Sequence, residues 1–167
     1  VRLVTSGMSD LPMATPEGAS VPKYLELMVS LPPDWKIDED SFKDESWYWP
    51  VRLLKQLARL PHKYNTWLGF GHTVPNGDPP EPYAPNTALC GSIVLPSVSV
   101  PEGFNKLSIN ADKEICFYSV VPLYEEEMNL KLRKGTDELL SLMGKRNLND
   151  VVNIKRVNVT KKRFGFL

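Results

Sequence analysis

Two apolar runs constrain the fold of this chain more than any other feature. Residues 87–95, TALCGSIVL, and 114–123, EICFYSVVPL, are apolar at successive positions rather than at alternate ones. Strands of this kind are buried on both faces, so both runs are expected to be central strands of a sheet that is covered on two sides. A chain of 167 residues can bury such a sheet, and we expect a single domain over residues 1–167.

Further strands are predicted from shorter patterns. Residues 24–31, YLELMVSL, alternate with a period of two and predict a strand. Short strands are expected at residues 3–4 and 107–109, and a late strand is expected at 151–159, where the alternation returns.

Prolines and a glycine suggest where the helices begin and end. Pro50 suits the first position of a helix and Pro61 is expected to stop it. Pro122 is expected at the start of a second helix, with Gly135 as its C-terminal cap, and Thr136 is expected to cap a third helix. These elements predict an α/β (α+β) fold, with helices packed on a mixed, largely antiparallel central sheet.

The composition excludes several functional classes. Twenty basic and twenty acidic residues cancel, so no net charge attracts the chain to nucleic acid or to an anionic membrane. No apolar run approaches the roughly 20 residues that span a bilayer. Cys90 and Cys116 lie within apolar runs, which predicts buried, reduced thiols and a cytoplasmic location. The chain starts at Val1 inside a strand-like pattern, so we expect that a natural N-terminal segment is missing.

The first candidate site is the segment LVTSGMSDLPM at residues 3–13. Its strand ends in small and polar residues, including Ser9 and Asp10. These side chains could satisfy local N–H groups in a tight turn. They could equally line the end of a sheet, where a partner strand is held by main-chain hydrogen bonds. The pattern leaves both interpretations open.

The second candidate is His72 in the segment GFGHTVPNG. A catalytic histidine needs a nucleophile and an orienting carboxylate, and Asp10 or Asp78 could supply the latter in a hydrolase. Both cysteines are expected to be buried, so a structural or binding role for His72 is favoured. Two histidines and two cysteines without ligand-like spacing predict no metal site.

Tryptophans form a third candidate group. Trp35, Trp47 and Trp49 cluster between the second expected strand and the first helix. Such residues are either lids over the core or anchors at a protein interface.

Six segments in order resemble the suppressor-of-fused family, and its bacterial single-domain branch in particular. They lie between residues 3 and 143, whereas the second, carboxy-terminal domain of the animal protein has no counterpart here. The matching segments are LVTSGMSDLPM, YLELMVSLPPDW, WPVRLLKQLARLP, GFGHTVPNGDPP, GSIVLP and ICFYSVVPLYEEEM.

This resemblance implies a suppressor-of-fused-like fold and a non-enzymatic protein-binding function without a cofactor. In the animal protein the domain helps to clamp a transcription-factor peptide, partly as an added strand. Bacterial relatives resemble immunity proteins or antitoxins that neutralise a toxin by binding it. Sequestration of a transcription factor is the alternative, and the oligomeric state stays open. The expected partner-binding residues are Ser9, Asp10, Met13, Trp49, His72, Asn76 and Asp78.

Overall fold

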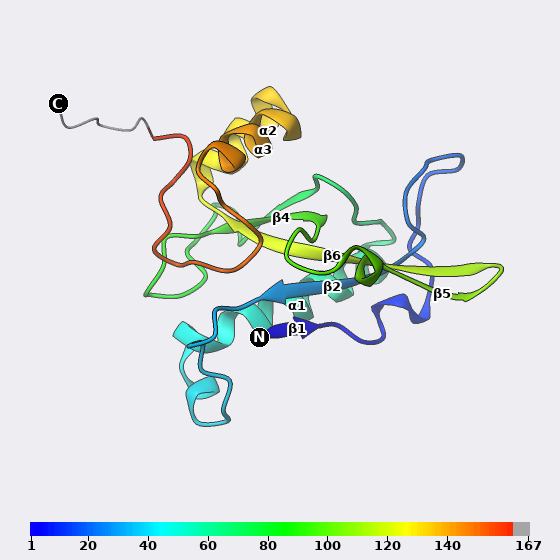
Figure 1. The fold of residues 1–167 in the computed structure, drawn as a ribbon, viewed down its shortest axis with the longest axis horizontal. Coiled ribbons are helices and arrows are strands. Elements are labelled where there is room, and N and C mark those ends of the chain that lie inside the picture. Colours follow the sequence, from blue (N-terminus) through cyan, green and yellow to red (C-terminus); the bar gives the residue numbers. More distant parts are fainter. Residues whose placement is uncertain (162–167) are drawn as a thin grey trace.

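The structure, a computed structural model, describes residues 1–161 apart from the side chain of Glu102 (Figure 1). Its strands are β1 (Arg2–Val4), β2 (Tyr24–Ser30), β3 (Thr73–Pro75), β4 (Gly91–Pro96), β5 (Lys106–Asn110) and β6 (Lys113–Leu123). Its α-helices are α1 (Glu45–Tyr64), α2 (Glu125–Lys134) and α3 (Thr136–Lys145), and short 3-10 helices span Met8–Asp10 (η1), Ser41–Lys43 (η2) and Glu102–Asn105 (η3).

The long strand β6 organises the sheet. The strand order is β1-β2-β6-β4-β3, and β5 also pairs with β6, in a hairpin that extends from the body of the domain (Figure 1). The pair β2 and β6 is parallel, whereas β1–β2, β3–β4, β4–β6 and β5–β6 are antiparallel. The predicted mixed, largely antiparallel sheet is therefore confirmed, as is the central position of the two apolar runs.

Helices cover the two faces of the sheet. On one face, Leu25, Leu27 and Val29 of β2 pack in a core cluster with the apolar side of α1. On the other face, Ile93 of β4 and Val121 of β6 pack against α2 and α3. Alternate residues of these strands point to opposite faces, so the apolar runs are apolar throughout because both faces are buried.

The start of α1 differs from the prediction. The helix begins at Glu45, where the side chain of Asp44 accepts a hydrogen bond from the Ser46 N–H at 2.8 Å as an N-cap. Pro50 therefore lies inside the helix rather than at its first position. Its missing N–H leaves the Ser46 carbonyl without a helical donor, and the Asn86 side-chain amide donates to that carbonyl at 3.3 Å.

The end of α1 is also later than expected. Pro61 does not stop the helix, which continues through one more turn to Tyr64. Asn65 ends it instead, in a left-handed conformation with φ 48°, and the Asn65 N–H bonds to the Pro61 carbonyl. Asparagine tolerates this conformation better than most residues, so the cap and not the proline sets the boundary.

The two short helices meet at a glycine. Gly135 caps α2 with φ 88°, as predicted. Pro122 belongs to β6, so it does not begin α2, and Thr136 is the first residue of α3 rather than its cap. The prediction placed the start of α2 too early because the apolar strand continues past Pro122 to Leu123, and it placed the start of α3 one residue too late.

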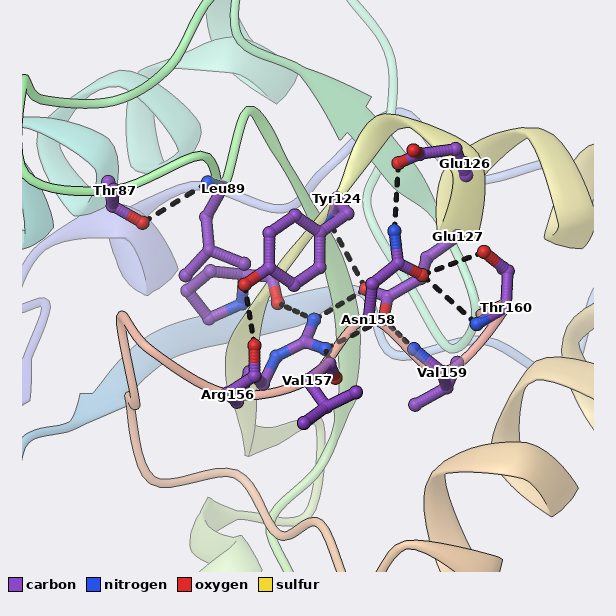
Figure 2. Close-up of polar contacts among 11 residues, drawn as sticks. Thr87, Leu89, Tyr124, Glu126, Glu127, Arg156, Val157, Asn158, Val159 and Thr160 are labelled. Atoms are coloured by element: carbon purple, nitrogen blue, oxygen red, sulfur yellow. Dashed lines mark hydrogen bonds and ion pairs between the residues drawn. The ribbon is translucent and has the colours of Figure 1, made fainter. Parts of the chain in front are cut away.

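The predicted late strand at residues 151–159 is wrong. Val151 forms an isolated bridge with Ser30, and the segment beyond it runs through turns. Figure 2 shows what holds it: the buried Glu127 carboxylate of α2 forms an ion pair with Arg156 and accepts the Val159 N–H at 2.9 Å. Side-chain contacts with α2 thus replace the ladder hydrogen bonds that the alternation had suggested.

Candidate functional site

The loop between β1 and η1 surrounds the carboxylate of Glu26. This carboxylate accepts hydrogen bonds from the Gly7 N–H at 3.0 Å, the Ser9 N–H at 3.0 Å and the Ser9 hydroxyl at 2.7 Å. The Thr5 hydroxyl donates a further one, at 2.5 Å. Gly7 adopts φ 108°, a conformation that favours glycine. The small residues after β1 therefore form a turn that donates hydrogen bonds to the buried Glu26 carboxylate.

This environment shifts the pKa of Glu26. Burial alone raises the pKa of the carboxyl, but the hydrogen bonds from Thr5, Ser9 and Gly7 lower it further than burial raises it. The net pKa lies below the ordinary value of 4.5, so Glu26 is ionised at neutral pH. Ser9 is accounted for by this local role, since its side chain is buried against Glu26.

Two of the expected partner-binding residues lie in the core. Met13 is buried, and the side chain of Trp49 is completely buried, stacked on Tyr83 with ring centroids 4.9 Å apart. Trp35 packs edge-on against Trp49 at 5.9 Å, which makes this part of the tryptophan group core. Neither Met13 nor Trp49 offers surface to a partner in this conformation, so any role of theirs in binding would be indirect.

Other expected residues gather at the far edge of the sheet. His72 directly precedes β3, and its ring packs on Trp67 with centroids 4.2 Å apart. Burial, and then the nearby Lys131 ammonium, lower the pKa of His72, so its imidazole is neutral at pH 7. Asn76 follows β3 and donates to the Glu81 carbonyl at 2.7 Å, while Asp78 is exposed.

The sheet separates His72 from Asp10. Asp10 is exposed in η1, just after β1, whereas His72 directly precedes β3. Strands β1 and β3 are the two opposite edge strands of the sheet. Four strand intervals of about 4.8 Å place the two edges roughly 19 Å apart. A general base and its orienting carboxylate must lie within hydrogen-bonding reach, so the structure does not bring this pair together as a catalytic unit.

A groove of about 870 Å³ runs between β1 and α1, and we call it the β1 groove. Its floor contains Leu3 from the strand and Val51, Leu54 and Ala58 from the helix. The helix also contributes basic side chains to its rim: Lys55, Arg59, His62 and Lys63.

Within residues 1–161, the outer edge of β1 has main-chain groups beside this groove that are not hydrogen-bonded. Val1 exchanges main-chain hydrogen bonds with Leu31 across the antiparallel pair, and the Thr5 N–H donates to the Leu27 carbonyl. Because such bonding alternates along an antiparallel strand, the N–H and C=O groups of Arg2 and Val4 point away from β2. An added strand could pair with both residues.

A second groove, of about 430 Å³, lies between α1 and β3, and we call it the β3 groove. It contains Val74, Pro75, Asn76 and Gly77 on the strand side. The His72 carbonyl accepts from the Val94 N–H of β4, and the Asn76 N–H donates to the Cys90 carbonyl just before β4. The alternation therefore turns the main-chain groups of Thr73 and Pro75 outward. Proline has no N–H, so this edge offers one outward donor where β1 offers two.

Helix α1 forms a wall of both grooves, and Arg59 and Lys63 line both of them. This basic side of the helix was not predicted from the sequence, because the prediction rested on the apolar, core-facing side alone. The signal was present, since Lys55, Arg59 and Lys63 recur at a spacing of four residues and therefore share one side of a helix.

We also searched the described part of the chain for metal sites, reactive cysteines and membrane-spanning helices. Within residues 1–161, no group of three or more His, Cys, Asp or Glu side chains is arranged to hold a metal ion. Cys90 and Cys116 are buried and unbonded, and burial is the main cause that raises the pKa of each thiol. No described helix is long and apolar enough to cross a membrane.

The fold and its open edges define an α+β domain that presents main-chain edges on both sides of one helix. A family model described as suppressor of fused protein (SUFU) matches residues 1–157. The chain therefore belongs to the suppressor-of-fused family, as the six sequence segments had indicated. A search of curated proteins found no match.

Three solved structures share the fold at low sequence identity. A protein of Neisseria gonorrhoeae described as a suppressor-of-fused homologue has a TM-score of 0.67 at 14% identity, over 96% of this chain and 71% of that one. Sufu in the Sufu-Fu complex has a TM-score of 0.65 at 17% identity, over 95% and 69%. Drosophila Suppressor of Fused has a TM-score of 0.64 at 16% identity, over 95% of this chain but 38% of its own length.

Proposed function

We propose that this chain is a non-catalytic protein-binding domain that captures an extended segment of a partner protein beside α1. One observation carries the proposal: both grooves along α1 have an exposed edge strand as their outer wall. Unpaired main-chain groups at a sheet edge recognise extended peptides by adding a strand. A family relative crystallised in the Sufu-Fu complex supports partner binding as the general activity.

We further propose that the partner is a toxin and that the chain acts as an immunity protein in the cytoplasm. The resemblance of the sequence to the bacterial single-domain branch supports this role, and the two free, buried cysteines are consistent with a reducing compartment. An immunity protein needs only to occupy a surface of the toxin, and exposed edges beside grooves suit that task.

Proline substitutions at the two edges test this function. The partner is first co-purified with the full-length protein from its source cells, identified, and titrated by calorimetry against purified wild type. Val4→Pro removes an outward N–H from β1, and Thr73→Pro does the same at β3, without loss of a ladder bond to the neighbouring strand. Leu3→Pro, which removes an inward donor, serves as the control that should destabilise the fold.

The proposal predicts that one of the two edge variants keeps its melting temperature and loses at least tenfold in partner affinity. The variant that loses affinity identifies the edge that binds. Wild-type affinity in both Val4→Pro and Thr73→Pro would contradict capture at a sheet edge.

A further inference from the structure

We infer that the captured segment is acidic, with carboxylates held by a stripe of cations on α1 formed by Lys55, Arg59 and Lys63. This inference rests on the proposed function and specifies the chemistry of the partner. It applies to an extended segment beside α1, because Arg59 and Lys63 line both grooves.

The cations of the stripe are exposed and available. In the described part of the chain, no carboxylate lies within 4.0 Å of the charged atoms of Lys55, Arg59 or Lys63. Lys55 donates to the Tyr48 hydroxyl at 2.9 Å and Lys63 lies over the ring of Tyr64, 5.1 Å from its centroid, and both contacts leave the charge unneutralised. All three side chains can therefore pair with an incoming anion.

The groove linings are one-sided in charge. No Asp or Glu is among the described residues that line either groove. The chain as a whole is neutral, so these two linings are more basic than the chain on average. Like charges across an interface are unfavourable, and a basic segment would therefore be rejected here while an acidic one is attracted.

The spacing of the cations suits a strand. Residues four apart on an α-helix are about 6 Å apart along its axis, and alternate residues of a strand are about 6.7 Å apart. Acidic side chains at every second position of an added strand would therefore meet Lys55, Arg59 and Lys63 in turn. The stems of glutamates would lie against Val51, Leu54 and Ala58 in the β1 groove.

The stripe also distinguishes the two edges. Lys55 lines only the β1 groove, whereas Tyr64 and Gln56 line only the β3 groove. A segment in the β1 groove should depend on all three cations, and one in the β3 groove on Arg59 and Lys63 alone.

Fluorescein-labelled peptides EVEIEVE and KVKIKVK provide the test, because they share their strand-forming pattern and differ in charge. Fluorescence anisotropy measures their binding to the wild-type chain at low and moderate salt. The variants are Lys55→Glu, Arg59→Glu and Lys63→Glu. Lys145→Glu is the control with the same change of charge, because Lys145 is an exposed residue of α3, the helix that packs on the other face of the sheet.

The inference predicts at least tenfold tighter binding of EVEIEVE than of KVKIKVK, with a difference that shrinks as salt rises. Arg59→Glu and Lys63→Glu should each weaken EVEIEVE binding about tenfold, and Lys145→Glu should not. Equal binding of the two peptides, or equal effects of Arg59→Glu and Lys145→Glu, would overturn it. If the native partner binds the wild type and Arg59→Glu equally, this inference fails while the proposed function stands.

Discussion

The carboxylate of Glu26 accepts both the main-chain N–H and the hydroxyl of Ser9, at 3.0 and 2.7 Å, and thereby fixes the turn that follows β1. Glu26→Gln keeps the size of the side chain but removes its charge and turns one acceptor into a donor. Hydrogen bonds to charged groups contribute about 1.5–3 kcal/mol each, so we expect a loss of about 2 kcal/mol or more in the free energy of unfolding. Urea denaturation measures it, with Asp10→Ala as control.

Asp10 is exposed beside this turn, and surface substitutions of this kind change stability by about 0.5 kcal/mol or less. A loss in Asp10→Ala as large as that in Glu26→Gln would contradict the assignment of the structural role to Glu26.

The stability that Glu26 provides should depend on pH in a definite direction. The pKa of Glu26 is lower in the folded chain than its ordinary value of 4.5. The unfolded chain therefore binds a proton more readily, and the contribution is complete above about pH 4.5 and lost as the pH falls through the folded pKa. Unfolding curves at pH 7, 5, 4 and 3 should show the gap between wild type and Glu26→Gln closing below pH 4.5. A gap that is constant over this range would refute the assignment.

The ion pair between Glu127 and Arg156 should be the interaction that contributes most to holding residues 151–159 against α2. Glu127 is completely buried and the Arg156 side chain is 6% exposed. Removal of one partner leaves a buried charge alone, which costs about 3–5 kcal/mol. We expect Arg156→Ala to show this loss in chemical denaturation, and to open residues 151–159 to proteolysis.

An exposed pair provides the comparison for this experiment. Lys43 and Asp40 lie 2.6 Å apart with side chains 73% and 89% exposed, and Lys43→Ala should be close to neutral. The double variant Glu127→Met/Arg156→Met should lose less than Arg156→Ala, because no lone charge remains buried. Equal losses of unfolding free energy in Lys43→Ala and Arg156→Ala would contradict a stabilising role for the buried ion pair.

Trp49 should affect stability rather than recognition. Its side chain is fully buried between Trp35 and Tyr83, so Trp49→Ala is expected to lose about 3–5 kcal/mol. Trp49→Phe is the milder variant, and at a temperature where it is folded its partner affinity should equal that of the wild type. Unchanged melting with lost partner binding would instead make Trp49 a contact residue, as the sequence had suggested.

Periodicity was informative wherever burial decided the structure. The runs containing Ile93 and Val120 are apolar throughout because helices cover both faces of the sheet, and this was readable in advance. The strand with Leu25 and Leu27 was found from a different signal, because the residues that face the core beside α1 alternate along it.

Long-range side-chain contacts were not readable. Pro50 lies inside α1 because Asp44 caps the helix earlier in the chain. The Asn86 side chain donates a hydrogen bond to the Ser46 carbonyl, which the proline leaves without a helical donor. The segment around Arg156 alternates like a strand, but Glu127, 29 residues earlier, fixes it in turns. Ser9 was a candidate for partner binding or for a local turn, and its hydrogen bonds to Glu26 could not be inferred from the pattern.

We expect this chain to act by occupying a surface of its partner and to transform no substrate. The decisive test is mass spectrometry of the co-purified partner, before and after incubation with catalytic and with equimolar amounts of the chain. The partner should keep its mass and be inhibited only at equimolar ratio, with the same result for His72→Ala. Chemical alteration of the partner by catalytic amounts of the chain, abolished in His72→Ala, would contradict it.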